Sequence, residues 1–214
     1  MSWRLVVSGL VVAAIVLGAT QVRARDANAA FWDWFRAHAA EVATIARGDE
    51  KIADRLAAEL HKIDPRLTFE VGVRNTPKEL IVSADGIRDA FPAVQRLVAA
   101  APPVAGWRVI AFRPRKAGMS IQTGDGRKLG VDDIAFEVLG KHADTIDVRF
   151  FVPGIGGADD AAAKQIGYLM LDAELGEYDV ETRLAGIDWK PSAARSAAAR
   201  PLHELPAVVD RLKH

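Results

Sequence analysis

The sequence contains no cysteine. This absence excludes disulfides, thiolate catalysis and cysteine-ligated zinc or iron–sulfur sites within the chain. The sequence also has no excess of positive or negative charge. It contains 28 lysine and arginine residues and 28 aspartate and glutamate residues, so its formal net charge is zero. Nucleic-acid-binding proteins usually carry a basic excess, so this balance argues against a dedicated nucleic-acid binder.

Common catalytic motifs are absent as well. The glycine-rich stretch 154–157 precedes a predicted helix but lacks the Lys-Ser/Thr pair that completes a phosphate loop. No G-x-S-x-G motif occurs, and the five histidines show no H-x-H or H-E-x-x-H spacing. We therefore predict no catalytic residue, no metal site and no cofactor.

One long apolar run occurs, from Leu5 to Val22, with Arg4 before it and Arg23 and Arg25 after it. It is long enough for the hydrophobic region of a signal peptide and is at the short end for a bilayer span. Three interpretations of residues 1–29 stay open: a signal peptide, a single uncleaved membrane anchor, or a misplaced start codon. The first two place the protein in the cell envelope, exported or membrane-anchored, and the third in the cytoplasm.

The segment from residue 30 to Pro65 has the pattern of two amphipathic helices, with Gly48 as a cap between them. The aromatic motif 31–35 (FWDWF) is either part of a buried stripe or a platform for a ligand or membrane interface. Its helical spacing favours the core. The apolar positions of the two helices are Phe31, Phe35, Val42 and Ile45, then Ile52, Leu56, Leu60 and Ile63.

Two later stretches share the pattern hairpin, helix, strand. In the first, strands 67–73 and 80–84 precede a helix that begins near Pro92 and a strand over 107–112. Two strands joined through such a helix most simply lie parallel, so a right-handed crossover is expected. The helix is expected to face the sheet with Phe91, Val94, Val98 and Ala101.

In the second stretch, strands 133–139 and 145–152 precede a helix that ends at Gly176, and a strand is predicted over 178–189. The turn residues 124–126 predict a short additional hairpin before it. The core face of the second helix is predicted to carry Ile166, Leu169, Met170 and Ala173.

These patterns predict an α+β fold. An N-terminal helical hairpin is followed by a mixed sheet built from the two hairpin–helix–strand units, with helices packed on the sheet. The α+β domain is predicted over 30–190. Residues 191–214 form a linker and a short C-terminal helix broken by Pro206.

Two charged groups carry candidate chemistry. Carboxylates can bind Mg²⁺ or Ca²⁺ or act as acid and base. Because this acidic group straddles a predicted helix end, we favour solvent-exposed carboxylates over a metal or acid–base site. The basic group follows a predicted parallel strand, where it could bind an anion, pair with the acidic group, or stay exposed. The acidic group is Asp172, Glu174, Glu177, Asp179 and Glu181, and the basic group is Arg113, Arg115 and Lys116.

A resemblance to known motifs is shared by five segments of the chain: 31–35 (FWDWF), 81–86 (IVSADG), 90–92 (AFP), 111–115 (AFRPR) and 165–182 (QIGYLMLDAELGEYDVET). They resemble motifs of an uncharacterised bacterial protein family with no assigned activity, and the similarity extends over 31–205. The resemblance implies a single compact unit and no catalytic residue. Members of that family usually begin near the aromatic motif, which adds weight to a misplaced start.

Two functions remain as hypotheses. The first is a non-enzymatic binding or protein-interaction module with a protein partner, in which Arg113, Arg115, Asp172, Glu177 and Asp179 are candidate binding residues. The alternative is a hydrolase or phosphate-handling enzyme in which both arginines, Asp172 and Glu177 surround one cleft. Only the enzyme requires these side chains to converge on a concave pocket.

Overall fold

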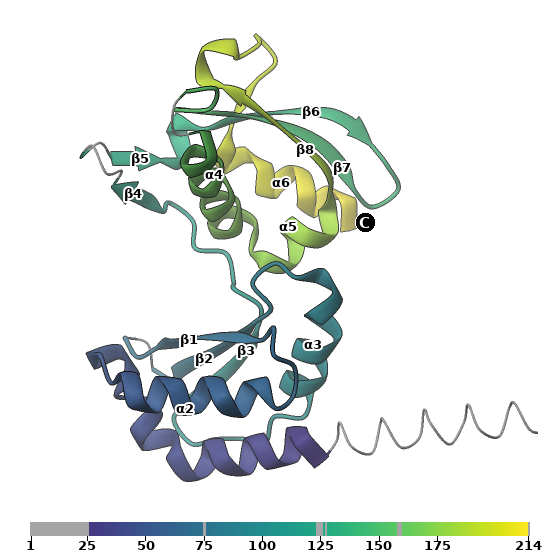
Figure 1. Ribbon diagram of the computed structural model, residues 1–214. Coiled ribbons are helices and arrows are strands. Elements are labelled where there is room, and N and C mark those ends of the chain that lie inside the picture. Colours follow the sequence, from purple (N-terminus) through teal and green to yellow (C-terminus); the bar gives the residue numbers. More distant parts are fainter. Residues whose placement is uncertain (1–25, 75, 123–125, 127, 158–159, 214) are drawn as a thin grey trace, which may run out of the picture. The chain divides into compact units, whose positions relative to one another are not determined.

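A computed structural model describes residues 26–74, 76–122, 126, 128–157 and 160–213. The apolar run Leu5–Val22, with the predicted signal peptide or anchor, lies outside the described residues. Among the described residues, no helix is long and apolar enough to cross a membrane. The chain divides into two compact units, Met1–Ala111 and Phe112–His214, a division that falls inside the predicted range 30–190 (Figure 1).

The first unit begins with the predicted pair of helices. A helix over residues 26–42 is followed by the 3₁₀ turn η1 (Ile45–Arg47) and by α2 (Glu50–His61). Gly48 ends the connection with a left-handed backbone at φ 89°, which glycine adopts without steric cost. The helical hairpin predicted from the spacing is confirmed.

The aromatic motif packs in the core of this unit. Phe31, Trp32 and Phe35 are buried, and the Phe35 ring lies edge-on to that of Trp107 with centroids 5.2 Å apart. The indole N–H of Trp32 donates a hydrogen bond of 2.9 Å to the Leu97 carbonyl. The core interpretation of the motif is therefore confirmed, although the spacing alone does not single out Trp32.

The sheet of the first unit forms around one crossover. Strands β1 (Thr68–Gly72) and β2 (Lys78–Ser83) are antiparallel, and β3 (Trp107–Ala111) lies parallel to β2. Between them lie the 3₁₀ turn η2 (Arg88–Ala90) and α3 (Phe91–Ala99), with Pro92 in the first turn of α3 as expected. This confirms the first hairpin–helix–strand unit.

The second unit repeats the plan with its own sheet. Strands β6 and β7 form an antiparallel hairpin, and β8 lies parallel to β7, with β9 at the other edge in the order β8-β7-β6-β9. The two predicted units thus build two separate mixed sheets. The strands of this unit are β4 (Ser120–Gln122), β5 (Lys128–Gly130), β6 (Ala135–Lys141), β7 (Ile146–Val152), β8 (Leu184–Pro191) and β9 (Arg200–Pro201).

One face of this four-stranded sheet carries the core. Apolar side chains of β6 and β7 pack there with those of α4 and α6, while the small hairpin of β4 and β5 is paired separately, as its turn residues predicted. The helices are α4 (Asp160–Leu175), α5 (Glu177–Arg183) and α6 (Leu205–Asp210), with 3₁₀ turns η3 (Val131–Asp133), η4 (Ser192–Ala194), η5 (Leu202–Glu204) and η6 (Arg211–Lys213).

The predicted strand 178–189 is wrong in its first half, where the chain forms α5 before β8 begins at Leu184. Gly176 turns the chain at φ 77°, and its carbonyl accepts the Val180 N–H, which starts the new helix. Glu177 and Asp179 lie in the first helical turn, where negative charge is favoured by the helix dipole.

Two smaller predictions are also wrong. Leu169 is 48% exposed, and Gly167 occupies the sheet-facing side of α4, where an added Cβ would lie 2.5 Å from the Trp189 ring. Leu169 therefore lies outside the contact face of α4, whereas Ile166, Met170 and Ala173 are buried or packed against the core as predicted. Pro206 does not break the C-terminal helix but lies in the first turn of α6, where a missing N–H costs nothing.

Candidate functional site

The candidate charged residues lie where residues 112–118, here named the 112–118 segment, run along the junction of α4 and α5. The Arg113 N–H donates to Glu177 Oε2 at 3.1 Å, and the Glu177 N–H donates to the Arg113 carbonyl at 3.0 Å. The Lys116 N–H donates to the Ala173 carbonyl at 2.6 Å. A segment that forms neither helix nor strand is thereby hydrogen-bonded to two helix ends.

Gly176 makes this close approach sterically possible. Its φ is positive, and a Cβ at this position would lie 3.1 Å from the Arg113 carbonyl oxygen. A larger residue would therefore meet both backbone strain and the 112–118 segment. Gly176, which was predicted as a helix cap, therefore also leaves room for the 112–118 segment.

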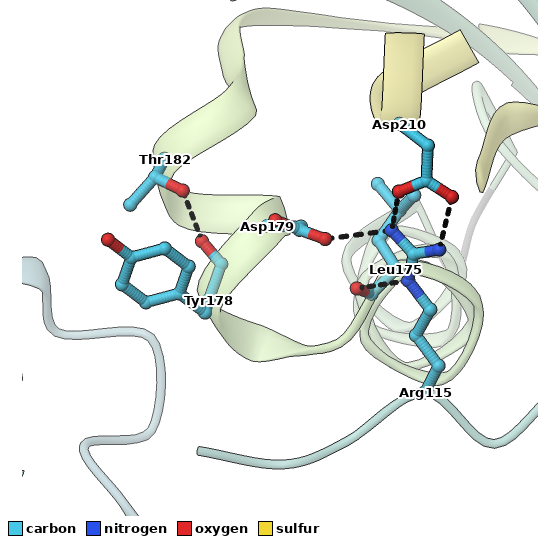
Figure 2. A network of polar contacts seen from close by, with 6 residues as sticks. All are labelled: Arg115, Leu175, Tyr178, Asp179, Thr182 and Asp210. Carbon is cyan, nitrogen blue, oxygen red and sulfur yellow. Dashed lines mark hydrogen bonds and ion pairs between the residues drawn. The ribbon is translucent and has the colours of Figure 1, made fainter. Parts of the chain in front are cut away.

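Arg115 joins three parts of the second unit (Figure 2). Its Nη2 donates to Asp179 Oδ2 at 2.8 Å and to Asp210 Oδ1 at 2.9 Å, and its Nη1 donates to Asp210 Oδ2 at 3.0 Å. Its Nε donates to the Leu175 carbonyl at 3.0 Å. The hydrogen bonds to Asp210 and Asp179 raise the pKa of this guanidinium above its usual value. Arg115 thus ties the segment to both α5 and α6.

The solvated interpretation of the acidic group is wrong for three of its members. Glu174, Glu177 and Asp179 are 3%, 0% and 8% exposed. Each accepts a hydrogen bond from the 112–118 segment, because the folded chain brings N–H donors of this segment to the helix junction. Sequence spacing could not reveal this burial, since the donors lie about 60 residues earlier in the chain.

The predicted alternative of internal pairing between the acidic and basic groups is confirmed at two points. Arg115 pairs with Asp179, and Arg113 Nη1 lies 3.9 Å from Asp172 Oδ2. The second contact is long for a hydrogen bond, and both side chains are about three-quarters buried. The candidate residues therefore come together, mainly by contacting one another.

A hollow of about 630 Å³ opens beside Arg115. Among the candidate binding residues, Arg115 contributes to its lining, whereas Arg113, Asp172, Glu177 and Asp179 do not. The hollow is lined by Arg115, Ala117, Gly118, Val131, Asp132, Glu174, His203 and Pro206.

A histidine–carboxylate pair lies at this hollow. His203 Nδ1 is 2.8 Å from Asp132 Oδ1, and both side chains are largely exposed. No sequence pattern indicates this pair, because its members lie 71 residues apart. Among the described residues, no three histidine or acidic side chains gather in a way that would hold a metal ion.

Comparisons of the chain with protein-family models, with curated proteins and with solved structures find no match. The resemblance to the bacterial family therefore stays a prediction.

Proposed function

We propose that the protein is a non-enzymatic binding module with a protein partner. The main support is that the strongest candidate for a catalytic cluster is engaged within the fold. Arg115 directs Nε, Nη1 and Nη2 to Leu175, Asp210 and Asp179. Because a guanidinium held in this way has few donors left for a substrate, its role is to fix the 112–118 segment.

Exposed apolar side chains on the helices support a protein partner. Tyr168 and Leu169 of α4 and Tyr178 of α5 are large, apolar and more than one-third exposed. The Tyr168 ring rests against Trp189 at a centroid distance of 5.0 Å, and the Tyr178 ring against Phe112 at 5.2 Å. Side chains held in place by such contacts lose little entropy on binding, which favours interface aromatics.

A matched pair of substitutions on α4 tests this proposal. Leu169→Asp places a charge among the exposed apolar side chains, and Gln165→Asp adds the same charge at an exposed position one turn earlier. The full chain captures its partner from the bacterial envelope, and the identified partner is then purified for affinity measurements. We expect Leu169→Asp to weaken binding by about tenfold or more, which corresponds to one interface anchor, and Gln165→Asp to leave it within about twofold.

Equal effects of the two variants would overturn the interaction surface. The enzyme alternative is tested separately, with general phosphomonoester, phosphodiester and ester substrates. Turnover that is present in the full chain and lost in both Arg113→Gln and Asp172→Asn would overturn the non-enzymatic proposal, because these two side chains would then act together on a substrate.

We further propose that the protein resides in the cell envelope. The support is the apolar run Leu5–Val22 with its flanking arginines. Cell fractionation followed by N-terminal sequencing tests this. Recovery in the soluble cytoplasm with an N-terminus near Phe31 would establish the misplaced start instead.

A further inference from the structure

The hollow beside Arg115 has the composition of a binding site for a small charged group. Val131, Pro206 and Ala117 provide apolar lining, and Glu174 and Asp132 provide carboxylates. Its volume of about 630 Å³ lies in the range of small-ligand pockets, which are mostly apolar with a few polar groups that orient the ligand.

Of the three buried carboxylates at the helix junction, Glu174 is the one that lines the hollow. Its side chain is almost completely buried, and its Oε1 accepts a hydrogen bond from the Gly118 N–H at 3.1 Å. A carboxylate offers about four acceptor sites on two oxygens. The second oxygen is therefore an acceptor that a ligand in the hollow can use.

The charge around the hollow selects the sign of that ligand. Asp132, Glu174, Arg115 and His203 line it. Arg115 pairs with Asp179 and Asp210, and His203 pairs with Asp132, so four carboxylates stand against one guanidinium and one histidine. Arg115 also directs its donors to those two aspartates rather than to the hollow. An anion would therefore meet repulsion, whereas a cation would meet net attraction.

We propose that this hollow binds an alkylammonium or alkylguanidinium group. The charged end donates to the free oxygen of Glu174 and to Asp132, and the methylene chain packs on Val131 and Pro206. Free amines and the lysine or arginine side chain of a protein share this chemistry. The inference deepens the proposed binding function, on which it rests, because it names the group that a partner or small ligand would insert.

The first test uses n-butylammonium and n-butylguanidinium as probes, with n-butanol and n-butyrate as controls of similar shape. Binding to the full chain is followed by NMR shift changes and by calorimetry. We expect both cations to bind at the hollow and both controls to fail. Butyrate binding as well as the cations would overturn the proposal, since the site would then not select positive charge.

Matched variants locate the site. Glu174→Gln keeps an acceptor for the Gly118 N–H but removes the charge, and we expect about 30-fold weaker binding of the cations. Glu137→Gln makes the same chemical change on β6, outside the hollow lining, and should leave binding unchanged. Asp132→Asn alters a largely exposed side chain that pairs with the equally exposed His203, and several-fold weaker binding is expected even if Glu174→Gln fails to fold. Unchanged binding in Asp132→Asn and in folded Glu174→Gln would overturn the proposal.

The partner-binding assay distinguishes the two possible sources of the cation and tests the cation site independently of the proposed function. Loss of partner binding in Glu174→Gln indicates a lysine or arginine side chain of the partner, and retained partner binding with lost butylammonium binding indicates a free amine. If Leu169→Asp has no effect on partner binding while butylammonium still binds, the proposed interaction surface on α4 is overturned and the proposed cation site is supported. Each result therefore addresses one of the two proposals.

Discussion

Replacing Arg115 by glutamine removes the side chain that ties the 112–118 segment to α5 and α6. The buried Asp179 carboxylate loses a charged donor at 2.8 Å, and a bond of this kind contributes about 1.5–3 kcal/mol. The Leu175 carbonyl loses a bond of about 1 kcal/mol. The pair with Asp210 is half-exposed and adds about 0–1 kcal/mol. We therefore expect the free energy of unfolding of the second unit to fall by about 2.5–5 kcal/mol.

The assay is urea denaturation of the full chain followed by circular dichroism, together with hydrogen exchange. The amides of Lys116 and Glu177 report on the segment directly, because they donate to Ala173 and Arg113 across the helix junction. We expect these amides to lose protection in Arg115→Gln before those of the β6–β7 hairpin do, since local opening needs less free energy than global unfolding.

Arg149→Gln is the matched control. Arg149 pairs with Asp188 at 2.7 Å between neighbouring strands, with about one-third of each side chain exposed. Such pairs contribute about 0–1 kcal/mol. If Arg115→Gln destabilises the protein no more than Arg149→Gln does, the structural role assigned to Arg115 is refuted, and its guanidinium must serve a different purpose.

Three further predictions concern single positions. Gly167→Ala should lower the melting temperature, because overpacking against Trp189 costs about 1–3 kcal/mol and exceeds a helix-propensity gain of about 1 kcal/mol; thermal denaturation by circular dichroism measures it. The hydrogen bond from Arg66 lowers the pKa of Asp64 in the folded protein, so this group stabilises the fold above its unfolded pKa of about 3.9 and the stabilisation is lost as pH falls through the lower folded value; urea titrations should show Asp64→Asn destabilising at pH 7, with a difference from the unsubstituted protein that shrinks as the pH falls below about 3.9. Trp32→Phe removes the indole donor to the Leu97 carbonyl, which keeps the Ala100 N–H at 3.2 Å, and should cost about 1 kcal/mol in urea denaturation, whereas no loss would show that the indole bond is not made in solution.

Local sequence patterns were sufficient to predict the order of the main strands and helices in each unit. The alternation before Pro92 and the helical spacing after it are properties of neighbouring residues, so the order of β1, β2, α3 and β3 follows from the sequence. The same holds for β6, β7, α4 and β8. Where one sheet ends and another begins is a tertiary property, and the patterns merged the two sheets into one.

The error over α5 has a physical cause. In residues 177–181, apolar Tyr178 and Val180 alternate with acidic neighbours, which is the pattern of a half-buried strand. The structure buries Glu177, Asp179 and Val180 but exposes Tyr178, because the acidic side chains meet donors from the 112–118 segment. Long-range hydrogen bonds have overridden a local pattern, and a single sequence contains no signal for them.

The same long-range contacts decide which acidic residues can serve a ligand. Glu177 and Asp179 bond the Arg113 N–H and the Arg115 guanidinium, and their carboxylates stabilise the fold. Glu174 lies at the same helix junction and is as deeply buried, but besides accepting the Gly118 N–H it lines a hollow. What separates Glu174 from the other two carboxylates is thus that its side chain also lines the hollow. Which carboxylate lines a hollow depends on where the 112–118 segment lies, so the density of acidic residues in the sequence could identify the region but not the residue proposed to bind a cation.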